Sequence, residues 1–212
     1  MTKRSAEHSI KGYLYQFLHT IYDILNQSDD NNLNTVEGTE DLDVLLQNDE
    51  TELSQYKYHE LTQFSNSKVG KPIGIMFNHF ASNQTEKYTY KLIIYTMDDH
   101  QIIDLETLQE ILKLKAAKDY IDKKNKEYCS DPEKIEEFYN KFKHISAQKI
   151  DNLEKATIKK IIDVFEVSEA EAEFNLFPLA IKEINTMATR NNKKERQITT
   201  REFISMIFLI YQ

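Results

Sequence analysis

Two short segments carry side chains of the kinds that can hydrolyse a phosphodiester. Residues 36–44 read Val-Glu-Gly-Thr-Glu-Asp-Leu-Asp-Val, and residues 53–58 read Leu-Ser-Gln-Tyr-Lys-Tyr. On a β-strand, side chains two residues apart point to the same face, so Asp41 projects together with Asp43. Gln55 and Lys57 project together in the same way. If the two strands are neighbours, one face of a sheet receives carboxylates, an amide and an ammonium group.

These groups suit metal-assisted hydrolysis. Carboxylate oxygens bind Mg²⁺ or Mn²⁺, which polarises the phosphoryl group and lowers the pKa of a bound water. A lysine near the metal can orient the attacking water and stabilise charge that develops on the phosphate. We therefore predict Asp43 as the principal metal ligand, Gln55 as a carbonyl-oxygen ligand or positioning group, and Lys57 as the water-positioning residue. Candidate second ligands are Glu37, Glu40 and Asp41. The alternative is that all of these residues lie on a solvated strand face or loop.

The histidines offer one further candidate. His59 follows Lys57 by two residues and could face the same cleft. The others have no partner at a metal-binding spacing, so a zinc hydrolase is not predicted; they are His8, His19, His79, His100 and His144. The sequence also contains no P-loop, nucleophile elbow or dinucleotide fingerprint, so an ATPase or an α/β hydrolase is not supported.

The hydrophobic pattern of the first half predicts a mixed α/β core. Apolar residues recur every three or four positions over residues 9–26 and 68–81, which is typical of amphipathic helices. Short runs at 33–37, 42–47 and 52–58 are separated by turn residues and read as strands. Residues 88–96 are rich in aromatic and β-branched side chains and form the clearest strand pattern. The predicted order is α-β-β-β-α-β.

The second half has a different character. All four glycines lie in the first 74 residues, and the later sequence is rich in Lys, Glu, Ile and Leu. We predict helices over residues 105–113, 132–143, 152–165, 168–185 and 199–211. The chain is therefore expected to consist of a core at 1–104 and a helical subdomain at 105–212 that serves as a lid, DNA clamp or assembly surface.

The charges are divided unequally between these halves. The net charge is −8, with 8 basic against 16 acidic residues before position 105 and 19 of each from there on. Bulk electrostatics therefore do not favour nucleic-acid coating, whereas local carboxylates are compatible with divalent cations. One basic cluster is a candidate for DNA phosphate contacts or simply a solvated loop; it consists of Arg190, Lys193, Lys194, Arg196 and Arg201.

Composition favours a reducing compartment. The single cysteine, Cys129, excludes an intrachain disulfide and cysteine-based zinc knuckles. The N-terminal segment lacks a signal-peptide apolar core, and the most apolar stretch, at 203–211, is well below the roughly 20 residues that a bilayer span requires. We expect a cytoplasmic protein without a membrane segment.

The motifs resemble those of a known family. Residues 12–16 (Gly-Tyr-Leu-Tyr-Gln), 37–43 and 55–60 are similar to the endonuclease effector domains of bacterial anti-phage systems. Such domains in CBASS and Lamassu loci belong to the PD-(D/E)xK superfamily, in a branch whose final motif is often Gln-x-Lys. The resemblance covers about residues 9–96 and continues more loosely through residues 174–201.

This resemblance implies a restriction-endonuclease-like core and a set of roles. Asp43 matches the motif aspartate, Gln55 and Lys57 match Gln-x-Lys, and Gln16 matches the helix-one glutamine. Gln55 stands where Glu or Asp is more common, which removes a negative metal ligand. The implied activity is Mg²⁺- or Mn²⁺-dependent cleavage of double-stranded DNA. A sensor or regulatory protein of a defence complex, together with self-association into an oligomer, would control it.

Two alternatives belong to other functional classes. The chain could be a catalytically silent nuclease fold that acts as a binding module in a larger defence complex, a reading that the acidic balance and Gln55 favour. It could also be a helical regulatory partner whose first half is only a scaffold; residues 105–212 alone would then retain partner binding.

Overall fold

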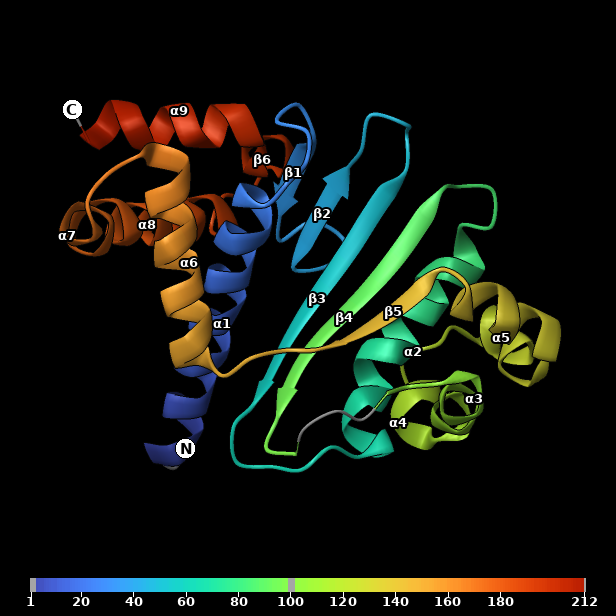
Figure 1. Ribbon diagram of the computed structural model, residues 1–212. Coiled ribbons are helices and arrows are strands. Elements are labelled where there is room, and N and C mark those ends of the chain that lie inside the picture. Colours follow the sequence, from blue (N-terminus) through green and yellow to red (C-terminus); the bar gives the residue numbers. More distant parts are fainter. Residues whose placement is uncertain (1–2, 99–101, 212) are drawn as a thin grey trace. The chain divides into compact units, whose positions relative to one another are not determined.

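The computed structural model describes residues 3–98 and 102–211 and has a mixed α/β fold, as predicted (Figure 1). Its strands form one sheet in the order β5-β4-β3-β2-β1-β6. The first half contains α1 (Lys3–Leu25), β1 (Leu33–Val36), β2 (Leu42–Leu45), β3 (Thr51–His59), α2 (Asn66–Ser82) and β4 (Tyr88–Thr96). The order α-β-β-β-α-β is therefore confirmed. The restriction-endonuclease-like core claims more than this order and stays a prediction.

The second half is mostly helical. It contains α3 (Leu105–Lys113), α4 (Lys115–Lys118), η1 (Lys123–Ser130), α5 (Pro132–Tyr139), β5 (Phe142–Ser146), α6 (Ile150–Phe165), α7 (Glu169–Glu171), η2 (Ala172–Leu176), α8 (Phe177–Ala188), η3 (Lys193–Arg196), β6 (Gln197–Thr199) and α9 (Thr200–Tyr211). The helix predicted at 132–143 ends at Tyr139, and β5 follows it. The helix predicted at 168–185 is interrupted by η2, a π-helix.

Two compact units divide the chain differently from the expected boundary at residue 104. The first unit comprises Met1–Asp49, Tyr56–Tyr58 and Gln148–Gln212, and the second comprises Glu50–Gln55 and His59–Ala147. The first unit therefore combines the beginning and the end of the sequence. The functional division into a core at 1–104 and a subdomain at 105–212 stays a prediction.

In the first unit, α1 packs against α6, α8 and α9. Its buried face includes Tyr15, Leu18 and Ile21, at the spacing expected of an amphipathic helix. Strand β1 pairs antiparallel with both β2 and β6, so that Thr35 lies opposite Asp43 on one side and opposite Gln197 on the other. This pairing brings the end of the chain beside the loop between β1 and β2.

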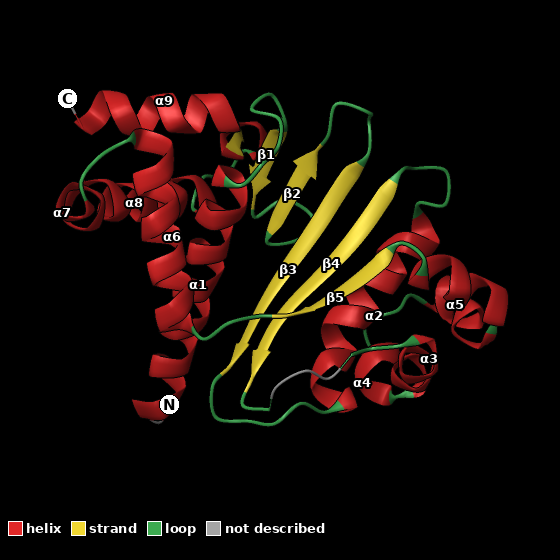
Figure 2. Cartoon of the chain, viewed as in Figure 1, coloured by secondary structure: helices red, strands yellow, loops and turns green. Residues whose placement is uncertain are grey.

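In the second unit, α2, α3, α4 and α5 gather beside β4 and β5 (Figure 2). The two strands run parallel, with Tyr90 opposite Phe142. Gly70 and Gly74 allow α2 to approach α4 closely, because a β-carbon at either position would meet Ala116 or the backbone of Ala117. Within the described residues, no helix has the length and apolar character needed to cross a membrane.

Candidate active site

The loop between β1 and β2 is organised by Asp43. Its carboxylate accepts the backbone N–H of Thr39 at 2.7 Å and that of Glu40 at 3.0 Å. Glu37 has a left-handed backbone with φ 50°, and its N–H donates to the Asp41 carbonyl at 3.0 Å. Gly38 leaves room for this arrangement, because a β-carbon there would collide with the Asp43 carboxylate. Both oxygens of Asp43 are thus engaged in holding the loop.

Asp41 is the carboxylate that meets Lys57. Its Oδ2 accepts the backbone N–H of Tyr56 at 2.7 Å and lies 3.7 Å from the Lys57 Nζ. The Gln16 side chain also donates a hydrogen bond to Asp41. The structure therefore brings together the helix-one glutamine, one of the two paired aspartates and the lysine of Gln-x-Lys.

The carboxylates share a buried environment that opposes their ionisation. Burial, followed by the charge of Asp41, raises the pKa of Glu40 to about 8, and Lys57 partly offsets this increase. Burial likewise raises the pKa of Asp41, and burial together with Asp41 raises that of Glu37. Glu40 is only 6% exposed and Asp41 9%. A low-dielectric cluster of this kind gains from a nearby cation, because a cation removes the mutual repulsion of the carboxylates.

Two residues of the predicted basic cluster reach this loop. Lys193 Nζ lies 3.5 Å from Asp43 Oδ2, and an Arg196 guanidinium N–H donates to the Glu37 carbonyl oxygen. The pairing of β6 with β1 explains their position, since both residues lie in η3 directly before β6. The others do not take part in these contacts: Arg190 donates to the Glu195 carbonyl oxygen at 2.7 Å, and Lys194 and Arg201 have exposed side chains.

Gln55 and His59 flank the three β3 residues that belong to the first unit. Gln55 is buried, at 8% exposure, and His59 is partly buried at the end of the strand. Both belong to the second unit, whereas the carboxylate cluster belongs to the first. Their predicted roles stay predictions. His100 lies outside the described residues.

An aromatic layer packs beside the cluster in the first unit. His19 stacks on Tyr56 with ring centroids 4.8 Å apart, and Tyr15 packs against both His19 and Tyr58. Burial lowers the pKa of His19 to about 3, so its imidazole is neutral. These rings fix β3 residues 56–58 against α1, and this contact positions Lys57.

The cluster offers carboxylate oxygens, the donor type that hard divalent cations prefer. Across residues 3–98 and 102–211, no three His, Cys, Asp or Glu side chains are grouped so that they could hold a metal ion. Mg²⁺, however, is commonly held by one or two carboxylates, with water and substrate phosphate completing its coordination. Glu40 and Asp41 are two buried oxygen donors whose ionised forms repel each other.

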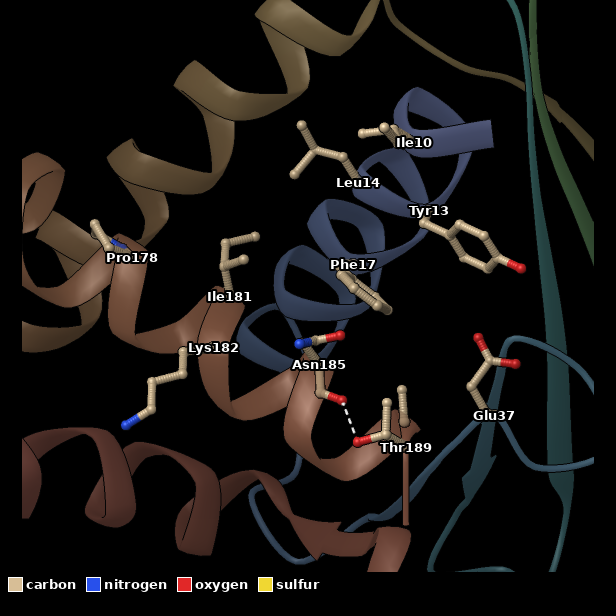
Figure 3. A pocket seen from close by; sticks show the side chains of 11 residues that line it. Ile10, Tyr13, Leu14, Phe17, Glu37, Pro178, Ile181, Lys182, Asn185 and Thr189 are labelled. Atoms are coloured by element: carbon tan, nitrogen blue, oxygen red, sulfur yellow. Dashed lines mark hydrogen bonds between the residues drawn. The ribbon is translucent and has the colours of Figure 1, made fainter. Parts of the chain in front are cut away.

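A groove that the motif pattern did not predict adjoins the carboxylate cluster. It has a volume of ≈ 830 Å³ and lies between α1 and α8, with Glu37 among its lining residues (Figure 3). On α1 the helical stripe indicated only a buried face, yet Ile10 and Tyr13 are 68% and 61% exposed. One sequence feature could have predicted this groove: α1 has apolar residues around more of its circumference than one packing face requires.

Comparisons with known proteins identify a fold relative and no sequence family. No family model matches the chain, and no curated protein matches it by sequence. Its fold resembles that of the Acinetobacter baumannii Cap4 SAVED/CARF-domain containing receptor, solved with the cyclic trinucleotide 2'3'3'-cAAA. The TM-score is 0.55 at 13% sequence identity, over 92% of this chain and 43% of the receptor chain. The chain thus spans less than half of the receptor's length, and the likeness is one of fold.

Proposed function

We propose that this chain is a metal-dependent phosphodiesterase domain that cleaves DNA in an anti-phage defence system. The observation that carries the proposal is the contact of the buried Asp41 with the partly buried Lys57, 3.7 Å apart, beside Glu40, whose pKa is raised to about 8. Strongly perturbed carboxylates next to a lysine are more typical of functional sites than of solvated strands.

Each residue of the cluster has a distinct proposed role. Asp41 and Glu40 hold Mg²⁺ or Mn²⁺, and Gln16 orients Asp41 through its hydrogen bond. Lys57 orients the attacking water and stabilises the charge that develops on the phosphate. Asp43 acts by shaping the loop that presents Glu40 and Asp41, because both of its oxygens already accept backbone N–H groups. This assignment moves the principal metal ligand from Asp43 to its neighbour two residues earlier.

The bound metal would supply polarisation of the phosphoryl group and a more acidic water. The protein supplies the rest: the carboxylates provide negative charge, the aromatic layer fixes the strand that bears Lys57, and Lys193 adds a positive charge 3.5 Å from Asp43. The role of carbonyl-oxygen ligand or positioning group for Gln55 stays a prediction, because Gln55 belongs to the second unit. DNA phosphate contacts by Lys193 and Arg196 would offset the acidity of the loop.

The defence setting rests on two separate likenesses. The motifs at residues 12–16, 37–43 and 55–60 resemble those of anti-phage effector nucleases, and the fold relative is a receptor solved with a cyclic trinucleotide. Control by a sensor chain and by self-association follows from the need to spare host DNA. Double-stranded DNA is the proposed substrate.

Plasmid cleavage in Mg²⁺ or Mn²⁺ tests the proposed activity. Lys57→Met should lower the rate of nicking by at least about 100-fold, the usual scale for loss of one electrostatic stabiliser. Lys91→Met is the matched control, since Lys91 is also a partly buried strand lysine paired with a carboxylate, that of Glu52. Equal cleavage by the wild type and Lys57→Met would reject the assignment.

A second candidate function is a silent binding module that senses a cyclic oligonucleotide. The fold relative favours it, because that receptor was solved with a cyclic tri-adenylate. Calorimetric titration with 2'3'3'-cAAA discriminates between the two candidates. A sensor should bind the trinucleotide in EDTA and retain that binding in Asp41→Asn, whereas the proposed nuclease should bind Mn²⁺ and lose that binding in Asp41→Asn.

A further inference from the structure

The groove between α1 and α8 has the composition of a site for a flat, mostly apolar ligand. Its walls carry Leu14 and Phe17 from α1 and Pro178 and Ile181 from α8, which lie on opposite sides of the groove (Figure 3). At ≈ 830 Å³ it is within the range of small-molecule sites, about 300–1,000 Å³. The groove is therefore large enough for a nucleotide.

The groove also has side chains that could form hydrogen bonds to such a ligand or stack on it. Asn185 is exposed, and its side-chain amide forms no hydrogen bond within the described part of the chain, while its backbone carbonyl accepts from Thr189. An amide presents both donors and an acceptor, the groups that recognise the edge of a base. Tyr13, at 61% exposure, offers a ring for stacking.

Glu37 connects this groove to the carboxylate cluster. Its side chain lines the groove, and its ionisation is coupled to Asp41, Lys57 and Arg196. A nucleotide bound across the groove and the carboxylate cluster would have its phosphate at the cluster and its base in the groove. The division of charge suits this placement, because the base is neutral and the phosphate is the part that needs a cation and a lysine.

We propose, resting on the function proposed above, that the groove binds one unpaired nucleobase next to the phosphate that is cleaved. Tyr13 and Phe17 provide the stacking surface, and Asn185 contacts the base edge. The substrate class is thereby narrowed to DNA with an unpaired or displaced nucleotide at the cleavage position, and fully stacked duplex would have to release a base before cleavage.

Binding of matched single strands tests this inference. The probes are fluorescein-labelled (dT)12 and a 12-mer of abasic sites with the same number of phosphates, measured by fluorescence anisotropy with Mg²⁺. All proteins carry Lys57→Met so that cleavage does not interfere. Tyr13→Leu should weaken (dT)12 binding by about 5- to 150-fold, equivalent to the 1–3 kcal/mol of one base stacked on an aromatic ring. It should leave binding of the abasic strand unchanged.

Three further variants sharpen the test. Tyr13→Phe should retain (dT)12 affinity, because the ring is kept. Asn185→Ala should weaken (dT)12 relative to the abasic strand. Tyr120→Leu is the matched control, since Tyr120 is also partly exposed, at 42%, but lies in the second unit; it should change nothing. Equal loss for both probes, or no loss in Tyr13→Leu, overturns the inference.

Two outcomes separate this inference from the function on which it rests. Base-dependent binding that requires Tyr13, in a wild type that neither cleaves DNA nor binds Mn²⁺, rejects the proposed function. Cleavage that requires Lys57, with (dT)12 binding unaffected by Tyr13→Leu, rejects the groove alone. Tight binding of 2'3'3'-cAAA that Tyr13→Leu abolishes would overturn the inference in favour of a sensor ligand, and a change of oligomeric state in Tyr13→Leu would overturn it in favour of a protein interface.

Discussion

At the scale of single residues, the cluster is defined by the cost of ionising buried carboxylates. Glu40 is the extreme case, with a pKa of about 8 caused first by burial and then by Asp41. A carboxyl group in this condition is a poor structural element, because its ionisation costs desolvation and adds repulsion from Asp41. In the proposed site it would serve as a metal ligand, since a divalent cation converts the repulsion into attraction.

Glu40 should make the metal-free protein less stable as the pH rises. The ordinary pKa of its carboxyl group is 4.5 and the pKa in the folded chain is about 8, so between these values the folded chain holds a proton that the unfolded chain has lost. The free energy of unfolding should then fall by up to about 1.4 kcal/mol per pH unit in this range. Urea unfolding of Glu40→Gln in EDTA should show a weaker slope. The exposed Glu136→Gln should keep the wild-type slope, and a wild-type slope in Glu40→Gln would contradict the burial account.

Asp43 should matter for stability as well as for cleavage. Replacing it with Ala leaves the N–H groups of Thr39 and Glu40 without their charged acceptor. The free energy of unfolding should fall by up to about 3 kcal/mol for each lost hydrogen bond. Chemical denaturation measures this change. Asp163→Ala, an exposed aspartate on α6, should alter stability by less than about 0.5 kcal/mol. A fully stable Asp43→Ala would contradict the role of Asp43 in holding the loop.

The residue types of the site were predictable, but the division of roles was not. Asp41 and Lys57 stood out by type and spacing, Gln16 was named only by the resemblance to the nuclease family, and the structure joins the three. The two-residue period treats Asp41 and Asp43 as equivalent. Asp41 lies before the first residue of β2, so that loop geometry, rather than strand alternation, decides which carboxylate faces Lys57.

At the scale of elements, strong periodicity predicted well and short elements were missed. The strand at 88–96 and the helix at 105–113 have the predicted bounds. β5 and β6 were missed because each is short and gains its stability from a partner distant in sequence, β4 and β1 respectively. The positions of Lys193 and Arg196 were therefore not predicted, because they depend on the pairing of β6 with β1.

Two glycines provide a matched test of helix packing. Gly74→Ala should destabilise the protein, because the added carbon would meet the backbone of Ala117, which cannot move as a side chain can. Gly12→Ala has nothing within 4 Å of the added carbon and should stabilise helix α1 by up to about 1 kcal/mol. Thermal unfolding of both variants checks the prediction. A stabilising Gly74→Ala would contradict the close approach of α2 to α4.

At the scale of the whole molecule, the first unit depends on both ends of the sequence. Its α1 packs against α6, α8 and α9, and its β1 lies between β2 and β6. The change in composition near residue 104 predicted a boundary there. Local composition does not record contacts between distant segments, so it could not predict that the end of the chain joins the first unit. Which segments of the chain meet was therefore beyond what the sequence pattern could predict.

A fragment of residues 1–104 should consequently fail to fold. It would expose the faces of α1 that α6 and α8 cover, and β1 would lose the pairing of Leu33 with Thr199. We expect no cooperative unfolding transition by circular dichroism, and broad, poorly dispersed NMR signals. The full chain serves as the control. A fragment that unfolds cooperatively would support the division predicted from composition.

Glu40 and Asp41, beside Lys57, are proposed to form a cation site, and calorimetric titration with Mn²⁺ at pH 7 tests this site most directly. Titrations in two buffers of different ionisation enthalpy count the protons released on binding. We predict Mn²⁺ binding with release of about one proton, from Glu40, since ligands must lose their protons to bind metal. Glu40→Gln should abolish the proton release, and Asp41→Asn should abolish binding. Absence of Mn²⁺ binding in the wild type, or binding that is unchanged in Asp41→Asn, would contradict the proposed site.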